Sequence, residues 1–311
     1  MGQHLFIDHR ECAVKLDGKA LVLSVPGRPP ASVPLHMLEQ ITVLVDLPLS
    51  TRLVHKLCNE GIGITLLNQR SRAEATYCFS LVHGNHERRL KQYRLVLDEE
   101  QSLPLAVQLV LAKLHTQRRA LMRYALMRRD QAGRLRMAAS RIAQLSADLS
   151  VMDRAALLGI EGSAARIHFD AYTTLFSDSL GFTGRNRRPP RDPVNAVLSL
   201  SYSMLTSECA RALAAVGLDP AFGIYHRPDY GRPSLACDLI ELVRTHADHF
   251  VWRLFAEQQL REHHFSRQLN SVVLNKEGRG IFFPRYQIEL RDCRRLIHRL
   301  ARRWTRQLEA L

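Results

Sequence analysis

The pattern of apolar residues changes once along the chain, near residue 80, and this change limits what the chain can fold into. Before it, short β-rich runs cover residues 5–8, 13–16, 20–25, 40–45 and 62–68, and Asp17-Gly18 is a hairpin signal between two of them. Beyond it, apolar residues recur at helical spacing almost to the end. We therefore predict an α+β protein with a small N-terminal β-rich domain and a larger, all-helical domain.

The border between the two patterns is polar. Residues 82–87 (Val-His-Gly-Asn-His-Glu) show no periodicity, which indicates a linker. We predict a β-rich domain over 1–82, a linker over 83–95 and a helical domain over 96–311. Helices are expected over 48–60, over about 131–147, from the capping pair Ser150 and Asp153 onward, from Asp192-Pro193 to Val216, and over about 284–308.

The chain is strongly basic. Its formal net charge is +14, from 44 Lys plus Arg against 30 Asp plus Glu. Such a charge favours a nucleic acid or an anionic membrane as the partner. No uncharged apolar run reaches the ~18 residues of a membrane span, and the first residues lack the pattern of a signal peptide. We expect a cytoplasmic protein that binds nucleic acid and no membrane.

The six cysteines are too far apart for a structural zinc site.

Arginines recur on one face of several predicted helices. In the last helix the opposite face is apolar, with Cys293, Ile297, Leu300 and Trp304. A run of like charges is usually a solvated face, but the persistence of one sign here indicates a track for phosphates. The arginines are Arg291, Arg295, Arg299, Arg302 and Arg306 in the last helix, and Arg118, Arg119, Arg123, Arg128, Arg129, Arg134, Arg136 and Arg141 in the middle helices.

Acidic residues within this basic chain are the candidate functional residues, and Glu161 is the first of them. Its neighbours one helical turn away are apolar, namely Leu157, Leu158, Ala164 and Ala165. We therefore expect its carboxylate to point from an apolar or tightly packed face. An ionised carboxylate in such a place costs several kcal/mol unless a cation or donors pair with it. The alternatives are a functional carboxylate and one paired to a buried arginine.

Asp238 and Glu241 are three residues apart, so they lie on adjoining parts of one helix face. Asp238 borders the apolar stripe of that helix, Glu241 lies one step further out, and both can aim at a pocket at the edge of the core. The alternative is a solvated acidic pair near Arg244.

His226 follows a Gly-rich turn. A lone histidine is more often a surface or satisfied core residue than a ligand, although site residues tend to lie in loops held by flanking structure.

Together, Glu161, His226, Asp238 and Glu241 offer carboxylate oxygens and one imidazole. These donors suit a hard cation such as Mg²⁺ or Mn²⁺ rather than zinc. Such an ion activates an attacking hydroxyl and neutralises charge on a phosphate under attack. The residues therefore predict a metal-dependent enzyme that acts on nucleic-acid phosphodiesters.

At these residues the chain resembles the CRISPR-associated integrases of spacer acquisition, the first-numbered Cas protein family. Asn85, Arg89 and Gln92 resemble the segment after the β domain of that family. One departure is His168, where many members have an aromatic residue such as Tyr. Four further segments are similar to the glutamate motif (158–166), the central helix (192–202), the histidine motif (217–226) and the acidic motif (234–244) of that family.

The resemblance implies the same two-domain fold and a set of site residues. The implied metal ligands are Glu161, His226 and Glu241, and Asp238 is the neighbouring acid, which would orient His226 or a metal-bound water. Arginines close to the motifs in sequence are candidate phosphate clamps, namely Arg166, Arg185, Arg187, Arg188 and Arg232.

The resemblance also implies a reaction and partners. The 3′-hydroxyl of a captured double-stranded DNA fragment attacks a phosphodiester at the repeat border of a CRISPR array, which inserts a new spacer and serves antiviral defence. Members form homodimers through the β domain. Two homodimers bracket a dimer of a small second acquisition protein, which gives a heterohexamer.

Two other functions fit parts of the sequence. A stand-alone, metal-dependent nuclease acting on branched DNA would use the same site residues. A non-catalytic DNA-binding scaffold would tolerate loss of the acidic residues. Its affinity for DNA would fall if the arginines were removed and would depend steeply on salt.

Overall fold

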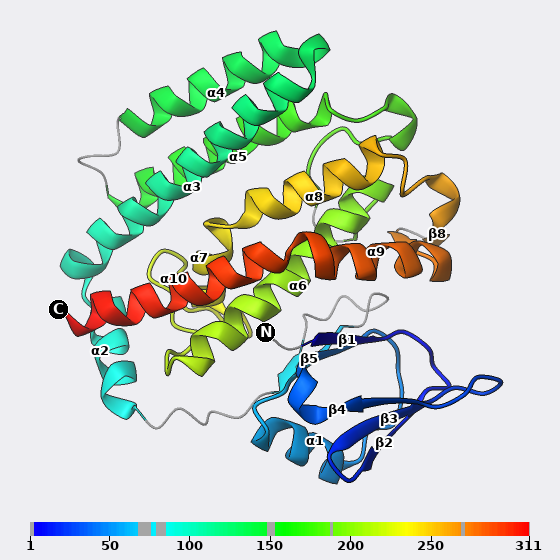
Figure 1. The fold of residues 1–311 in the computed structure, drawn as a ribbon. Helices are drawn as coiled ribbons and strands as arrows, with labels where there is room; N and C mark the ends of the chain where they lie inside the picture. The colour runs from blue at the N-terminus through cyan, green and yellow to red at the C-terminus, as the bar shows by residue number, and fades with distance from the viewer. Residues whose placement is uncertain are drawn as a thin grey trace. The chain divides into compact units, whose positions relative to one another are not determined.

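The structure is a computed structural model that describes residues 3–67, 76–78, 85–147, 153–186, 189–268 and 271–310. The chain divides into two compact units, Met1–Asn85 and His86–Leu311. The first is β-rich and the second is mainly helical (Figure 1). This confirms the predicted α+β class and the order of its parts.

The first unit holds two small sheets. Its elements are β1 Gln3–Ile7, β2 Ala13–Asp17, β3 Ala20–Ser24, β4 Ala31–Pro34, η1 Leu35–Met37, β5 Leu38–Val43, α1 Thr51–Asn59, β6 Gly63–Leu66 and β7 Thr76–Cys78. One sheet has the order β1-β5-β6-β7, in which β5 is parallel to β1 and β6, and β7 is antiparallel to β6. The other is the antiparallel sheet β2-β3-β4.

Each predicted strand of this unit overlaps an observed one, and the predicted hairpin joins β2 to β3. Asp17 pairs with Ala20, and Gly18 has a φ of 56°, which a glycine adopts without strain. Helix α1 begins later than predicted because Ser50 caps it, accepting from the amide of Leu53 at 3.2 Å. The short strands β4 and β7 were not predicted.

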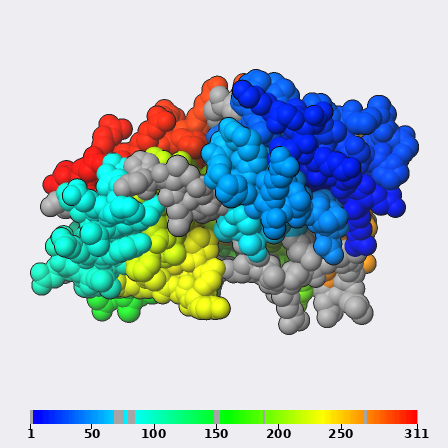
Figure 2. Space-filling model, turned by 90° about the horizontal axis from the view of Figure 1, so that it is seen from below, coloured from blue at the N-terminus to red at the C-terminus, as the bar shows by residue number. Residues whose placement is uncertain are grey.

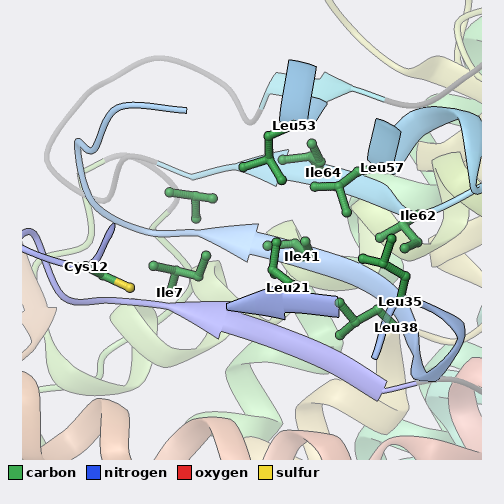
Figure 3. Packing of buried hydrophobic residues seen from close by; sticks show 11 residues of the cluster. Ile7, Cys12, Leu21, Leu35, Leu38, Ile41, Leu53, Leu57, Ile62 and Ile64 are labelled. Atoms are coloured by element: carbon green, nitrogen blue, oxygen red, sulfur yellow. The ribbon is translucent and has the colours of Figure 1, made fainter. Parts of the chain in front are cut away.

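The first unit has its own apolar core (Figure 3). Leu53 and Leu57, one turn apart on α1, are buried in the same cluster as Ile41 and Ile64 of the first sheet and Leu21 of the second. Burying a side chain of this size contributes roughly 1.5–3 kcal/mol. The apolar residues of the β-rich runs therefore account for the packing of this unit.

The second unit is built around α6. Its elements are α2 His86–Leu97, α3 Glu99–Met127, η2 Arg129–Gln131, α4 Ala132–Ala147, α5 Arg154–Thr173, η4 Asp178–Leu180, α6 Pro193–Ala215, α7 Ser234–Glu241, α8 Arg244–Ala256, η5 Glu262–His264, β8 Phe265–Gln268, β9 Ser271–Leu274, α9 Lys276–Glu289 and α10 Arg291–Glu309. Helix α6 is buried along most of its length and packs against α7, α8 and α10 (Figure 1). It therefore supports the short helix α7 from inside the unit.

The two ends of α6 were predicted correctly. Asp192 accepts from the amide of Asn195 at 2.8 Å, and Pro193 occupies the first turn of α6. Gly217, with a φ of 81°, follows the end of that helix. The predicted pair Ser150 and Asp153 differs in detail, because Asp153 is itself the N-cap of α5 and accepts from the amide of Ala156 at 2.8 Å. Ser150 lies outside the described residues.

Three predictions for this unit were wrong in detail. Most of the predicted linker 83–95 belongs to α2, whose buried face includes a polar residue, Gln92, and so lacks a plain apolar stripe. The unit is not all-helical, because β8 and β9 form a hairpin. The predicted last helix over 284–308 is two helices that meet at Leu290. Asn275 caps the first of them, so Pro284 lies in its interior rather than at its start.

No helix in the described ranges is both long enough and apolar enough to span a membrane.

Candidate active site

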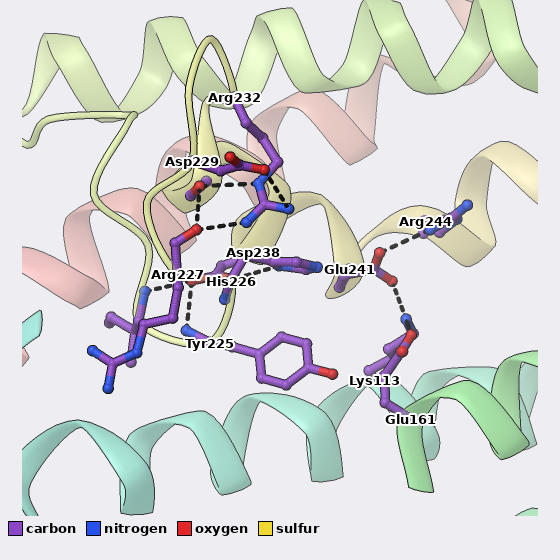
Figure 4. Close-up of polar contacts among 12 residues, drawn as sticks. Lys113, Glu161, Tyr225, His226, Arg227, Asp229, Arg232, Asp238, Glu241 and Arg244 are labelled. Atoms are coloured by element: carbon purple, nitrogen blue, oxygen red, sulfur yellow. Dashed lines mark hydrogen bonds and ion pairs between the residues drawn. The ribbon is translucent and has the colours of Figure 1, made fainter. Parts of the chain in front are cut away.

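His226 is held in place by Asp238 of α7 (Figure 4). Its ring Nδ1 lies 2.6 Å from Asp238 Oδ1, and its backbone amide donates to the same oxygen at 2.9 Å. The other oxygen accepts from the amides of Ile224 at 2.6 Å and Tyr225 at 2.9 Å. Asp238 is fully buried, so four donors converge on one carboxylate out of contact with water. These four contacts fix the orientation of the carboxylate.

This contact decides which nitrogen of His226 is free for chemistry. An ionised carboxylate only accepts, so the Nδ1 of His226 must carry the proton that is shared with Asp238. In the neutral ring, Nε2 then presents its lone pair outward. A carboxylate behind a histidine is the usual arrangement for a ring that ligates a metal through its other nitrogen.

The loop that carries His226 is fastened to α2 and α5. Gln92 of α2 donates to the carbonyls of Asp219 and Phe222, both at 2.8 Å, and accepts from the amide of Asp219. Arg154 of α5 donates to the carbonyls of Ile224 and Tyr225 at 2.9 and 3.1 Å. In the space-filling view, the yellow surface of the loop and α7 adjoins the cyan surface of α2 and α3 (Figure 2).

Glu161 of α5 and Glu241 of α7 converge on Lys113 of α3 (Figure 4). The ammonium Nζ donates to Glu161 Oε1 and lies 2.6 Å from Glu241 Oε2. The side chain of Lys113 is 4% exposed and that of Glu161 is 22% exposed. Three helices that are distant in sequence therefore supply one compact cluster of charges. The partner of Glu161 is a buried lysine, where the sequence had left a buried arginine as an alternative.

Arg244 neutralises the second oxygen of Glu241. Its Nη1 donates to Glu241 Oε1 at 2.8 Å, and its guanidinium lies 4.2 Å from the ring centre of Tyr202. Burial alone raises the pKa of the Glu241 carboxyl, but the charges of Lys113 and Arg244 outweigh it and lower the pKa to about 2. Glu241 is therefore ionised at neutral pH.

Glu241 is slightly more exposed than Asp238, in the order expected from the helical wheel, but both residues are buried. Asp238 is 0% exposed and Glu241 is 6% exposed, so neither borders the solvent. The alternative of a solvated acidic pair is wrong for the same reason, although Arg244 is indeed the partner of Glu241. Helix α7 is covered by α6 on one side, which a helical wheel of α7 alone could not indicate.

A polar cavity of about 300 Å³ adjoins the charge cluster. The residues around it come mainly from α3, α5 and α8. His168 lies in its wall and is buried, with Nε2 3.2 Å from Asp248 Oδ2. The charged residues of the lining are Lys113, Glu161, Arg166, Asp170, Arg185, Glu241, Arg244 and Asp248.

The five arginines named as phosphate clamps have different surroundings. Arg166 and Arg185 line the cavity, and Arg185 is braced by Asn195 and Ser199 at 2.7 and 3.0 Å. Arg232 is not among the residues that line it, and its guanidinium donates to the carbonyl of Arg227 at 2.5 Å within its own loop. Arg187 and Arg188 lie outside the described residues.

The predicted arginine face of the last helix is present on α10. Cys293 and Ile297 are buried, Leu300 and Trp304 are half-buried, and the arginines point to solvent. The exposed arginines are Arg291, Arg295, Arg299, Arg302 and Arg306.

Glu161, His226 and Glu241 fit a hard divalent cation by their chemistry. The two carboxylates already gather around one positive charge, the Lys113 ammonium, and His226 presents Nε2. Their ligand atoms are not all within 4.8 Å of one another. In the described residues that spacing is met by His263, His264 and Glu277 instead. The two carboxylates contact the same Lys113 Nζ and so lie close together, and the residue that stands outside this spacing is His226.

The match to a family model settles what the chain is related to. The model for CRISPR associated protein Cas1 matches residues 5–288. The chain belongs to the Cas1 family. Among curated proteins, a CRISPR-associated endonuclease Cas1 of Thermodesulfovibrio yellowstonii is 35% identical over 291 residues, which are 91% of this chain and 90% of that one. The resemblance found in the four sequence motifs is confirmed.

Solved structures agree on the Cas1 fold. A Cas1 protein from Thermotoga maritima matches with a TM-score of 0.87, covering 99% of this chain and 97% of the other at 22% identity. A casposase bound to an integration product matches with a TM-score of 0.86, covering 100% and 91% of the two chains at 20% identity.

Sequence reasoning missed Lys113 and Arg154. Lys113 shares the buried face of α3 with Val110, Leu114 and Leu121, and one charged residue inside an apolar stripe is a signal that a helical wheel would have shown. Arg154 follows the cap of α5, and nothing local in the sequence indicates that it reaches the loop of His226.

Proposed function

We propose that this Cas1 protein is a metal-dependent DNA integrase and endonuclease that inserts captured DNA into a CRISPR array as new spacers. The observation that carries the proposal is the convergence of Glu161 and Glu241 on one positive charge, in the same cluster of helices as an oriented His226. The name of the curated Thermodesulfovibrio relative, an endonuclease, supports the class of reaction.

Each site residue has a role in this proposal. Glu161, Glu241 and the Nε2 of His226 would hold Mg²⁺ or Mn²⁺. When bound, the ion supplies positive charge next to the phosphate under attack. Asp238 keeps His226 in the tautomer and orientation that ligation needs. Arg166 and Arg185 bind phosphate from the wall of the cavity.

The proposed reaction is a transesterification. The 3′-hydroxyl of the captured fragment gives up its proton to solvent, and its oxygen forms a bond to the phosphorus of a phosphodiester at the repeat border. The bond from that phosphorus to the 3′-oxygen of the target strand breaks, and the released oxygen takes up a proton. The protein forms no covalent bond in this step, so positioning and charge account for its contribution.

The partners we propose are double-stranded DNA, a second copy of the chain and a small second acquisition protein. The DNA partner is supported by the charge of +14 and by the exposed arginines of α10. The homodimer through the β-rich unit and the heterohexamer with the second protein are supported by the family resemblance.

Strand transfer into a supercoiled plasmid that carries a leader and a repeat tests the proposal. The reaction would contain a short duplex with free 3′-hydroxyls, the small partner protein, and Mg²⁺, Mn²⁺ or EDTA. We expect metal-dependent joining at the repeat border, lost by at least about 100-fold in Glu161→Ala. Glu100→Ala, an exposed glutamate of α3, is the matched control and should join normally.

The other outcomes separate the competing functions. Cleavage without joining would favour the stand-alone nuclease. DNA binding with neither reaction, unchanged by Glu161→Ala, would favour the scaffold.

A further inference from the structure

Lys113 lies on the buried face of α3, where Leu109, Val110 and Gln117 are its buried neighbours one turn away. An ammonium in such a place is unfavourable unless acceptors surround it. The acceptors it has are the carboxylates of Glu161 and Glu241 (Figure 4). The charge of Lys113 is therefore directed at two of the proposed metal ligands.

Glu241 has one oxygen to offer to a metal ion. Its Oε1 accepts from Arg244 at 2.8 Å, and its Oε2 lies 2.6 Å from Lys113 Nζ. A Mg²⁺ ion would bind that oxygen at about 2.1 Å. An ammonium and a divalent cation on the same oxygen would be close enough to repel each other strongly. Lys113 and the ion therefore compete for Glu241 Oε2.

We propose that Lys113 is a built-in counter-ion that holds Glu161 and Glu241 together and leaves them when the divalent cation binds. This inference rests on the proposed metal site. The side chain of Lys113 is a flexible four-carbon stem, and the adjoining cavity of about 300 Å³ offers it the carboxylates of Asp170 and Asp248 as new partners. Lys113 is thus a positioning residue that keeps two like charges together and sets how tightly the ion binds.

Lys113→Met tests this role because it removes the ammonium and keeps most of the length of the unbranched side chain. We expect the affinity of the whole protein for Mn²⁺, measured by the electron paramagnetic resonance signal of free Mn²⁺, to rise at least about tenfold. We also expect its Tm in EDTA to fall below that of the wild type, with a larger rise on adding Mn²⁺. Arg118→Met, which removes an exposed charge from the same helix, should change neither quantity.

Lys113→Arg should change the affinity for Mn²⁺ in the opposite direction to Lys113→Met. It keeps the inference testable if Lys113→Met does not fold. A guanidinium can bond both carboxylates with its fixed fork, so we expect Mn²⁺ to bind more weakly than to the wild type. Mn²⁺ binding that is no tighter in Lys113→Met, or tighter in Lys113→Arg, would overturn the counter-ion role and leave the metal site standing. Wild-type Mn²⁺ binding that Glu161→Ala leaves unchanged would instead overturn the metal site.

Discussion

At the scale of single residues, the site depends on how buried charges are paired. Asp238 accepts from His226 twice and from the amides of Ile224 and Tyr225. The same side chain in a solvated helix would be an ordinary acid. Here its charge fixes both the path of the backbone around His226 and the position of the ring proton. Its contribution to function is therefore one of orientation.

Asp238→Asn tests that role. The amide keeps the size of the side chain but removes the charge. It also replaces one acceptor oxygen by an NH₂ group, which cannot accept from the donors that face it. We expect strand transfer to fall 10- to 100-fold and the free energy of unfolding in urea to fall by about 3 kcal/mol. Asp229→Asn, an exposed acid of the same loop, is the control. Normal strand transfer by Asp238→Asn would contradict the role.

At the scale of elements, the loop between α6 and α7 is shaped by close backbone packing. A Cβ at Gly223 would lie 2.3 Å from the carbonyl oxygen of His226 and 2.8 Å from the carbonyl carbon of Ser234. Backbone atoms cannot move aside as the end of a flexible side chain can. The Gly-rich turn before His226 is therefore required by the packing of the loop against the start of α7.

Gly223→Ala should displace this loop. We expect a loss of about 1–3 kcal/mol in the free energy of unfolding, as for other overpacked sites, together with reduced strand transfer. Gly133→Ala is the contrasting variant, because a Cβ there meets nothing within 4 Å and the residue lies in α4. It should stabilise the protein by about 0.5–1 kcal/mol and leave strand transfer unchanged. Equal unfolding curves for Gly223→Ala and the wild type would refute the packing argument.

At the scale of the whole molecule, the net charge of +14 coexists with a few buried carboxylates. Glu161 and Glu241 are matched by Lys113 and Arg244, whereas Arg291, Arg295, Arg299, Arg302 and Arg306 of α10 are exposed to solvent. Positive charge is thus internal at the site and external on the surface. The exposed charge should govern how strongly DNA is bound. The charge inside the site should govern the reaction on the bound DNA.

The salt dependence of DNA binding measures the external charge. A triple variant with Arg299→Gln, Arg302→Gln and Arg306→Gln removes neighbouring exposed charges from α10. We expect weaker binding, and a plot of log affinity against log salt whose slope is smaller by about 2–3. Ile288→Gln, an exposed residue of α9, is the control without a change of charge. An unchanged slope would show that this face does not contact phosphate.

Much of this protein could be predicted from local sequence. The hairpin at Asp17-Gly18, the caps Asp153 and Asp192 and the apolar periodicity depend on near neighbours along the chain, so they could be read without a structure. The family also followed from motifs that are continuous in sequence, and the family-model match confirms it.

Tertiary structure decided the rest, because those features depend on residues far apart in the chain. The helical character of residues 86–95 comes with the contacts of Gln92 to Asp219 and Phe222, more than a hundred residues away. Glu241 is buried where α7 meets Lys113 of α3 and Arg244 of α8. The pairing of Lys113 with Glu161 and Glu241 joins three helices, and no local pattern encodes it. Local motifs were enough to identify the family and the charged groups. Which charges neutralise each other depends on distances of a few ångströms between helices, and those distances exist only in the folded chain.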